Sequence, residues 1–349
     1  MTVKVTKPAV NLREELADLR KPSGIAGEAM LRAETPQEQF NLIGAGRRNL
    51  ALNGNFTVSQ RGDYSSATSI TTGSYCVDRF YHDINGVTAT VQRVANGFSN
   101  RVASLKVAAT SSASGYIGAT QRTNSTENSG LFSDGDYGYV VFSMWMKSNT
   151  SKAGMYIYND GRHDRQAHSG NGQWEYLVAR APLSKMTATT IDFHATFYDS
   201  GTVSVSSGDY IEIANVQVER NVTGVATPFE NRSYGQEMAA CQRYFQVFTE
   251  SGDTTFGTAV AYTGNAAYDG TQQIFPVEMR ASPTRSTSGS WSASDGLGSD
   301  FGVTSFYGNN TKWGYQLGFG VSSGLTTGRW YSIRALNGSG SQLKFDAEL

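Results

Sequence analysis

The chain has 349 residues, of which 38 are Gly, 2 are Cys, 17% are charged and 11% are aromatic, and 29 Lys and Arg balance 30 Asp and Glu. This balance excludes a nucleic-acid binder with a broadly basic surface, and two cysteines exclude a disulfide-rich mini-fold or a cysteine-rich zinc site. The sequence contains no apolar run of about 18 residues, so it predicts no membrane-spanning helix. The remaining composition is typical of an all-β protein with many turns.

The first 45 residues differ from the rest, because they are rich in charge and contain no Tyr or Trp. Capping signals at Asn11 and Thr35 predict two short helices, and Gly44 ends the second. Helices this short are marginal alone, so their apolar faces should dock on a partner, on symmetry mates or on the β body. The docking side chains that we predict are Leu12, Leu16, Leu19, Phe40 and Ile43.

Residues 46–231 show the alternation of half-buried strands. Apolar and polar side chains alternate over 140–147 and 191–198, which predicts strands with one core face. The parity of the apolar positions changes at Ala214-Asn215, which predicts a β-bulge. Many short strands without intervening helices indicate an antiparallel sandwich or jelly roll.

Residues 232–349 begin with a capping pair, Ser233 and Gln236, which predicts a helix to about residue 243. A second β-rich block follows, and Gly/Ser-rich stretches at 286–300 and 336–341 are predicted loops. The fold class that we predict is therefore mainly β. A short N-terminal helical anchor precedes two antiparallel β-sandwich, jelly-roll-like domains, with boundaries at 1–45, 46–231 and 232–349.

Several short motifs occur in an order that resembles tailed-phage virion proteins. Residues 48–62 read RNLALNGNFTVSQRG, and 75–80 read YCVDRF. Residues 213–230 resemble the closing strand of carbohydrate-binding-module-like jelly rolls in phage fibres. Further similar stretches are the virion-attachment-like segment at 22–44 and the segments 241–245, 279–284 and 345–349.

The resemblance implies a structural appendage of a phage particle that is assembled in the host cytoplasm. The form it favours is a homotrimeric tail fibre, held on tail or capsid proteins by its N-terminus, whose β-domains contact a host glycan or receptor. A capsid-decorating or head-fibre protein, serving particle stability or loose adhesion, is the alternative. A polysaccharide depolymerase is a third interpretation. No nucleic acid, membrane insertion or cofactor is expected.

Aromatic side chains are the first candidate contacts, because aromatic rings either fill a core or stack on sugar rings. The sequence leaves both roles open in the middle strands of the first block and around an expected loop of the second. The aromatic candidates and the loop residue beside them are Trp145, Trp174, Tyr158, Tyr307, Asn309 and Trp313.

A polar cluster at 160–168 is predicted to be a loop between strands, and its candidates are His163, Asp164 and His168. It could contact a glycan or partner, ligate a metal, or only be solvated, and its spacing is not a zinc motif. An Asp-Gly-Asp stretch at 134–136 lacks the downstream Glu of a calcium loop. We therefore expect no metal site.

Catalytic motifs are missing: the sequence has neither a Gly-x-Ser-x-Gly elbow nor a His-Glu-x-x-His helix. Glu212 and Glu219 are expected to face solvent. The prediction is a non-enzymatic protein. Cys76 and Cys241 are predicted to be buried thiols.

Overall fold

A computed structural model describes residues 48–99, 102–128, 131, 138–197, 202–249, 255–268, 273–336 and 340–348. The chain divides into two compact units, residues 1–50 and 51–349. The helices predicted within 1–45, and with them Leu12, Leu16, Leu19, Phe40 and Ile43, lie outside the described residues.

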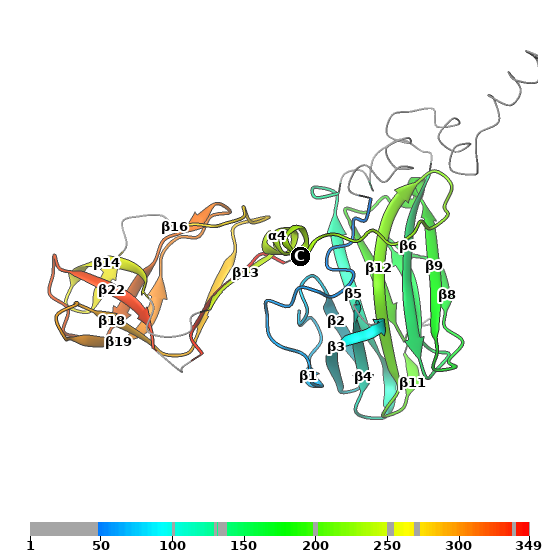
Figure 1. Cartoon of the computed structure of the whole chain (residues 1–349), viewed down its shortest axis with the longest axis horizontal. Coiled ribbons are helices and arrows are strands. Elements are labelled where there is room, and N and C mark those ends of the chain that lie inside the picture. The colour runs from blue at the N-terminus through cyan, green and yellow to red at the C-terminus, as the bar shows by residue number, and fades with distance from the viewer. Residues whose placement is uncertain are drawn as a thin grey trace, which may run out of the picture. The chain divides into compact units, whose positions relative to one another are not determined.

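The first β region is a sandwich of two six-stranded antiparallel sheets (Figure 1). Sheet 1 runs in the order β1 (Thr68–Ile70), β3 (Ala89–Ser99), β4 (Val102–Ala109), β12 (Tyr210–Asn221), β6 (Tyr139–Ser148), β9 (Trp174–Pro182). Sheet 2 runs in the order β11 (Val203–Val205), β5 (Ala113–Asn124), β10 (Thr190–Thr196), β7 (Gly154–Tyr158), β8 (Arg162–Ala167), and β2 (Tyr81–Asn85) also pairs with β5. A short 3-10 helix, η2, covers Leu183–Lys185.

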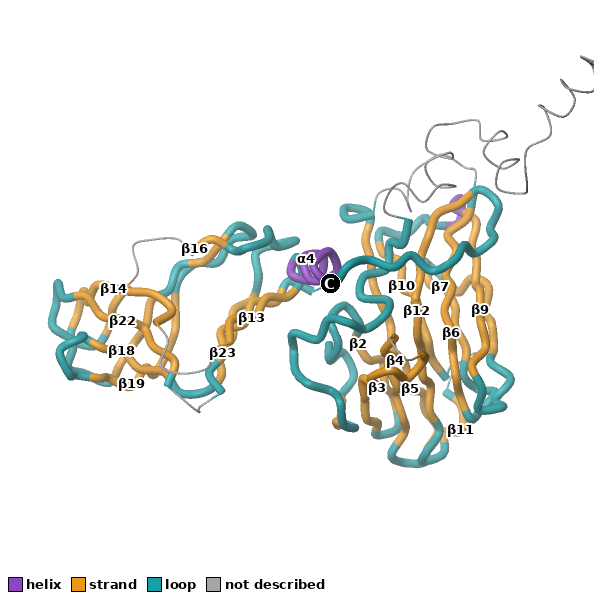
Figure 2. The backbone as a smooth tube through the Cα atoms, viewed as in Figure 1, coloured by secondary structure: helices purple, strands orange, loops and turns teal. Residues whose placement is uncertain are grey.

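The core between the sheets follows from period-2 alternation along the strands. Phe142, Met144 and Met146 of β6 point inward and are fully buried, as are Ile191 and Phe193 of β10. The strands of both sheets run in nearly the same direction (Figure 2), which is the aligned form of sheet packing. The predicted strand at 140–147 is thereby confirmed as β6, and the one predicted at 191–198 is confirmed as β10 up to Thr196.

The predicted bulge in β12 is also confirmed, since the register with β6 shifts between Ala214 and Gln217 and Asn215 has φ 50°. The extra residue turns the amide of Val216 toward Gly54, whose carbonyl accepts a 2.8 Å hydrogen bond from it. This contact pins residues 51–56 to the last strand of the sandwich.

Substitution of Gly54 by alanine should destabilise the sandwich, because a Cβ at this position would lie 2.0 Å from the carbonyl oxygen of Val216. Backbone must move to relieve this clash, so we expect a loss of about 2 kcal/mol in the free energy of unfolding. Urea denaturation measures it. Gly235→Ala is the matched control, because it is helical and a Cβ there would have no neighbour within 4 Å. Equal effects of the two changes would contradict the prediction.

The C-terminal block begins with the predicted helix, α4 (Tyr234–Gln242), whose capping box joins Ser233 and Gln236. A three-stranded sheet contains β13 (Phe245–Thr249), β23 (Gln342–Asp346) and β17 (Thr284–Ser288), and a two-stranded one contains β16 (Gln273–Ile274) and β20 (Gly314–Tyr315). A closed barrel is formed by β14 (Thr255–Thr263), β15 (Ala266–Tyr268), β21 (Gly318–Val321), β19 (Asp300–Tyr307), β18 (Trp291–Ser294) and β22 (Trp330–Ala335).

The mainly β prediction is confirmed, with two corrections in this block. The sequence suggested a second sandwich, whereas the structure has a closed barrel beside two small sheets. The predicted loop at 286–300 is also corrected, because β18 lies within it. Its small side chains, Ala293 and Ser292, are buried inside the block together with Trp291. The small side chains of β18 therefore belong to the packed interior of the block.

Two arginines of the phage-like motifs hold the C-terminal segment against the sandwich loops. Arg79 pairs with Glu348 and lies over the Tyr244 ring, 3.4 Å from its centroid. Arg61 pairs with Asp346 at 2.7 Å and lies over Phe245 at 3.9 Å. We call this group the arginine clasp: Arg61, Arg79, Tyr244, Phe245, Asp346 and Glu348.

The motif residue Asn53 has a structural role beside the clasp. Its backbone has φ 57°, a conformation that Asn tolerates. Its side-chain amide donates to the carbonyls of Val58 (2.8 Å) and Asp78 (3.0 Å) and accepts from the Val58 amide (2.9 Å). The motifs that resemble phage proteins therefore build the fold around the clasp.

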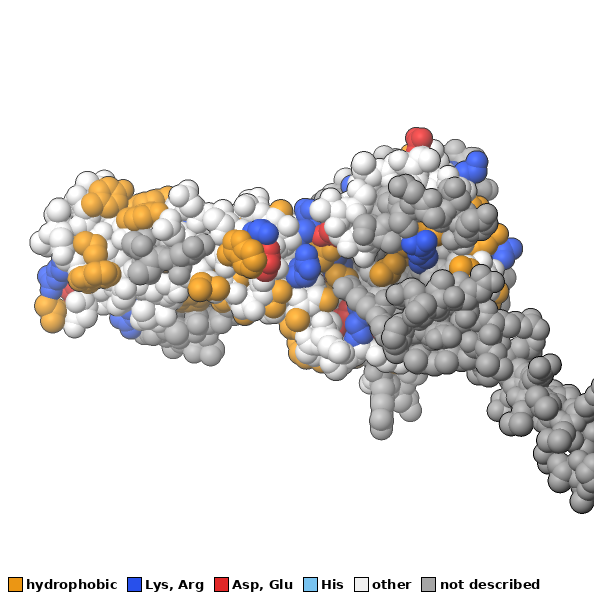
Figure 3. Space-filling model, turned by 90° about the horizontal axis from the view of Figure 1, so that it is seen from above, with side chains coloured by type: hydrophobic (Ala, Val, Ile, Leu, Met, Phe, Trp, Pro, Cys, Tyr) orange, Lys and Arg blue, Asp and Glu red, His pale blue; other side chains and the backbone are white. Residues whose placement is uncertain are grey.

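The described surface carries few charged side chains on the face shown in Figure 3. In the described ranges no helix is long and apolar enough to cross a membrane. Cys76 and Cys241 are free and buried, as predicted, and burial raises the pKa of both thiols.

Candidate functional site

The outward face of sheet 2 brings together polar and aromatic side chains from β2, β5, β7, β8 and β10. On β10, Ile191, Phe193 and Ala195 enter the core, so Asp192 and His194 project from the other side of the sheet. Two cross-strand rows result. One row contains Tyr81, Thr120, His194 and Tyr156, and the next contains Arg122, Asp192, Tyr158 and Arg162. We call these eight residues the sheet-2 face.

The next row contains two glycines, and Asp83 of β2 lies at one end of it. Gly118 and Gly154 flank Thr196 on the neighbouring strands. Thr196 donates to the carbonyl of Ile117 at 3.0 Å, and a Cβ on Gly118 would lie 2.9 Å from the Thr196 side chain.

The charged row is fixed by a forked ion pair. Arg122 donates from Nε and Nη2 to the two carboxylate oxygens of Asp192, each at 2.6 Å. The Tyr81 hydroxyl lies 3.5 Å from Asp192 Oδ2 and 3.4 Å from Arg122 Nη2. A two-point contact of this kind orients both groups, so each presents its remaining hydrogen-bonding capacity in a fixed direction.

The aromatic row is organised around His194. Its ring stacks on Tyr156 with centroids 4.6 Å apart, and Tyr158 meets it edge-on at 6.3 Å. Thr120 Oγ1 lies 2.9 Å from His194 Nδ1. The guanidinium of Arg162 lies 5.4 Å above the Tyr156 ring.

The electrostatics keep His194 neutral near pH 7. Burial lowers the pKa of its imidazole to about 4, against the opposing attraction of Asp192. A neutral imidazole both donates and accepts hydrogen bonds. Burial also raises the pKa of the Tyr81 phenol and of the Asp83 carboxyl.

Access differs along the face. Tyr158 is 44% exposed and the Arg122 side chain 37%, whereas Tyr156 and His194 are each 6% exposed. The exposed pair can touch a ligand directly, and the buried pair supports it from below. Aromatic rings beside fixed hydrogen-bonding groups suit a ring with one apolar face and several hydroxyls, such as a sugar.

Among the predicted candidates, only Tyr158 belongs to the sheet-2 face. Trp145 and Trp174 lie on sheet 1, on the opposite side of the sandwich. There Trp145 contacts Tyr176 (5.4 Å) and Phe98 (5.3 Å), and Phe98 also contacts Trp174 (5.0 Å). The two tryptophans are half-buried, neither core nor fully exposed, and they do not form one site with Tyr158.

The polar cluster at 160–168 requires a correction, because His163 and Asp164 lie on strand β8 and not in a loop. Asp164 accepts from the Arg180 amide (2.8 Å) and from Gln166 (2.7 Å), which ties β8 to β9. His163 Nε2 lies 3.2 Å from the Asn159 carbonyl.

The prediction that His168 contacts a ligand is corrected, because its side chain is fully buried. Its Nδ1 accepts from the Gly170 amide (2.8 Å), and its Nε2 lies 2.9 Å from the Gln173 carbonyl. It shapes the turn at 169–173. Within the described residues, no group of three or more His, Cys, Asp or Glu is arranged to hold a metal ion.

Glu212 and Glu219 are also corrected, because both are buried and not solvent-facing. Glu212 accepts from Ser104 Oγ at 2.5 Å. Glu219 accepts from the amide and the hydroxyl of Thr227, each at 2.7 Å. Strand parity placed both carboxylates outside the core, but β4 and the segment around Thr227 supply hydrogen-bond donors to them there.

The candidates in the C-terminal block remain predictions. Trp313 is 55% exposed, and Lys312 lies 4.7 Å from its ring. Asn309 is exposed, and its carbonyl accepts from the Gln316 amide at 2.9 Å. Tyr307 belongs to β19 and its hydroxyl lies 3.2 Å from that of Tyr262.

Sequence analysis did not name seven members of the sheet-2 face as site residues: Tyr81, Thr120, Arg122, Tyr156, Arg162, Asp192 and His194. The parity of Asp192 and His194 against their apolar neighbours was a usable signal. It could not reveal which side chains of β2, β5 and β7 stand beside them, because register depends on strand pairing.

No protein-family model and no curated protein matches the chain. Among solved structures it is similar to TmCBM61 in complex with β-1,4-galactotriose (12% identity, 50% of this chain and 100% of that one, TM-score 0.31). It is also similar to a putative sugar binding protein from Bacteroides thetaiotaomicron (13% identity, 50% of this chain and 100% of that one, TM-score 0.29). A third similar structure is the enzymatically active domain of bacteriophage CBA120 tailspike protein 4 (12% identity, 50% of this chain and 21% of that one, TM-score 0.32). At these identities the likenesses concern the fold.

Proposed function

We propose that the sandwich binds carbohydrate at the sheet-2 face and that the chain is a non-enzymatic adhesive protein. The observation that carries this proposal is the arrangement of the two rows. Tyr158 and Arg122 are accessible from solvent, and the buried side chains beside them are Tyr156, His194 and Asp192. A sugar ring would stack its C–H face on Tyr158. Neighbouring hydroxyls would bond to Arg122, which the buried Asp192 holds in place.

We further propose that the chain is a phage virion appendage, a homotrimeric tail fibre held on the particle by residues 1–45. The order of motifs along the sequence supports this. Three copies would let weak sugar contacts hold a particle on a cell, because linked sites act at high effective concentration. A capsid-decorating or head-fibre protein is the alternative.

Substitution of Tyr158 by alanine is expected to weaken glycan binding about tenfold, the loss of one stacking contact worth about 1.4 kcal/mol. Retention in gels that contain host-surface polysaccharide measures it. Tyr158→Phe keeps the ring and should bind nearly as well. Trp145→Ala on sheet 1 is the control, and a loss in that variant alone would move the site to the opposite face.

Imaging of labelled protein on intact particles tests the location. Signal at the tail supports the tail fibre, and signal over the capsid supports the alternative.

Deletion of residues 1–45 should leave a folded body that no longer joins particles. Normal incorporation of the truncated chain would contradict the anchor assignment.

A further inference from the structure

The outside of the barrel carries a row of positions across five strands, and four of them hold large side chains while the fifth is Gly318. Cross-strand partners link Trp330 of β22 to Val260 of β14, Val260 to Tyr268 of β15, Tyr268 to Gly318 of β21, and Gly318 to Tyr307 of β19. Their neighbours in sequence, such as Tyr331, Ala259 and Phe319, fill the barrel core, so the row faces outward.

The row has a floor without side chains, which lets rings lie across the strands. Gly318 and Gly320 occupy the outward positions of β21. A Cβ on Gly318 would lie 2.2 Å from the Tyr307 ring, so this ring rests directly on the backbone of β21. Tyr268 lies parallel to Tyr307, with an angle of 4° between ring planes and centroids 6.4 Å apart.

Hydroxyl groups connect these rings to one another and to the backbone. Tyr262, two residues beyond Val260, reaches Tyr307 with the two hydroxyl oxygens 3.2 Å apart. The Tyr307 oxygen also lies 2.7 Å and 2.9 Å from the carbonyls of Ala267 and Phe319. The Tyr268 hydroxyl donates to Gln316 Oε1 at 2.6 Å. The side-chain NH2 of Gln316 can then donate to a ligand.

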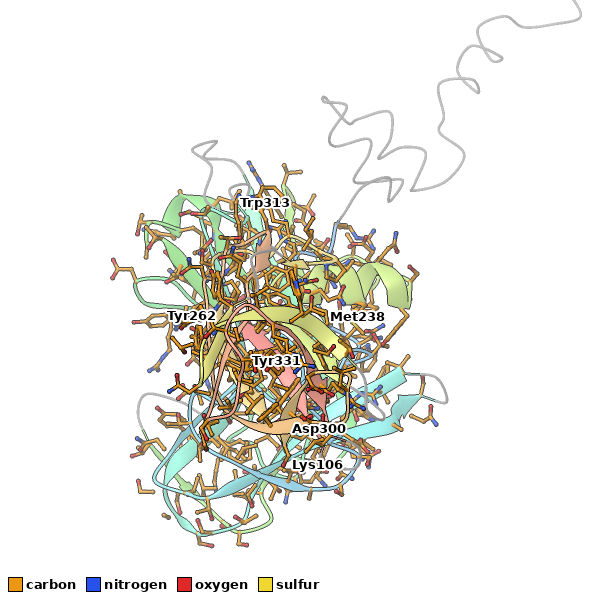
Figure 4. All side chains as sticks on the ribbon, turned by 90° about the vertical axis from the view of Figure 1, so that its left-hand side faces the viewer. Lys106, Met238, Tyr262, Asp300, Trp313 and Tyr331 are labelled. Atoms are coloured by element: carbon orange, nitrogen blue, oxygen red, sulfur yellow. The ribbon has the colours of Figure 1, made fainter. Side chains whose placement is uncertain are left out.

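Exposure is concentrated at one side of this group. Tyr262 is 55% exposed and Trp330 is 58% exposed. Figure 4 shows Tyr331 inside the ring of strands and Tyr262 on its outside. Figure 3 shows hydrophobic side chains gathered on the surface of this block among mostly uncharged neighbours. We call Trp330, Val260, Tyr262, Tyr268 and Tyr307 the tyrosine row.

The chemistry of the row selects the occupant. None of its side chains carries a charge, unlike the sheet-2 face with its arginines and aspartate. Fixed aromatic rings with phenolic hydroxyls and an amide complement a ligand that has apolar C–H faces and neutral hydroxyls. A charged ligand would lose hydration here and gain no counter-charge from the row.

We propose that the tyrosine row is a second binding site, specific for uncharged oligosaccharides and independent of the sheet-2 face. Trp330 and Tyr262 would stack on sugar rings, and the Gln316 amide would bond to a hydroxyl. A single chain would then hold glycan through both of its β-blocks.

The test uses the full chain with Tyr158→Ala, which removes the stacking contact of the sandwich. Retention is measured by affinity electrophoresis in gels of galactan, mannan or dextran, and in polygalacturonate as a charged probe. We expect retention on at least one uncharged polysaccharide and none on the polyanion. Adding Tyr262→Ala or Trp330→Ala should weaken that retention at least fivefold with an unchanged Tm, since both side chains are more than half exposed.

Tyr234→Ala is the matched control, because Tyr234 is 59% exposed, belongs to α4 of the same block and lies outside the row. No retention of the Tyr158→Ala chain on any uncharged probe would overturn the proposal. Unchanged retention in both row variants, or loss only in Tyr234→Ala, would also overturn it. A changed oligomeric state of the row variants in sedimentation would overturn it too, because a second copy of the chain would then be the occupant.

Discussion

Replacement of Arg79 by alanine is expected to lower the free energy of unfolding by about 3 kcal/mol, because it leaves a buried carboxylate with half of its partners. The side chains of Arg79 and Glu348 are only 3% and 4% exposed. Arg79 also donates to the Arg122 carbonyl at 2.8 Å and stacks on Tyr244. Denaturant titration of the full chain measures the loss.

Two further variants make this result interpretable. Arg79→Lys keeps the charge but loses the planar fork, so it should recover only part of the stability. Lys312→Ala removes an exposed ion pair with Glu278, whose side chains are 47% and 39% exposed, and should cost less than about 1 kcal/mol. Similar losses for Arg79→Ala and Lys312→Ala would contradict the central role of the clasp.

Acidification is expected to destabilise the sandwich strongly between about pH 6.5 and pH 4. Burial lowers the pKa of His82 and of His194 to about 4, from 6.5. In this window the two histidines bind protons in the unfolded chain but stay neutral in the native state. The free energy of unfolding therefore decreases as the pH falls. Each histidine contributes up to about 3 kcal/mol, at about 1.4 kcal/mol per pKa unit.

The carboxyls oppose this trend in part. Burial raises the pKa of Asp78 and Asp83, so the native state takes up their protons earlier than the unfolded chain and regains some stability. The contribution of one histidine is therefore best read from a difference. His82→Met should reduce the stability lost between about pH 7 and pH 4.5 by about 2 kcal/mol, measured by urea titration at both values. Parallel pH curves for the two chains would contradict the assignment.

The sandwich could be predicted to a large extent from residue patterns. Alternation along 140–147 and 191–198 indicated the strands, the parity change at Ala214 indicated the bulge, and Ser233 with Gln236 indicated the helix. These signals are local, since each depends on neighbours within one element. The barrel could not be predicted in this way, because its closure depends on β14 pairing with β22, about seventy residues further along the chain.

The candidate site was predictable only in fragments. Aromatic content singled out Tyr158 along with Trp145 and Trp174, but nothing in the sequence placed them on opposite sheets. His168 was attractive as a polar residue in a polar stretch, yet its two ring nitrogens are used by the turn that follows it. Such a role depends on backbone groups, which sequence composition does not distinguish.

The arginine clasp can form only after the C-terminal end of the chain has been synthesised. Arg79 and Glu348 are 269 positions apart, and Arg61 and Asp346 are 285 apart. A ribosome that has completed the sandwich strands has not yet made either carboxylate. Until then the two arginines stand in the nascent chain without these partners, and the sandwich lacks the contacts that secure its loops. Premature termination anywhere in the C-terminal block would therefore leave a protein with a weakened sandwich, which cellular proteases can recognise.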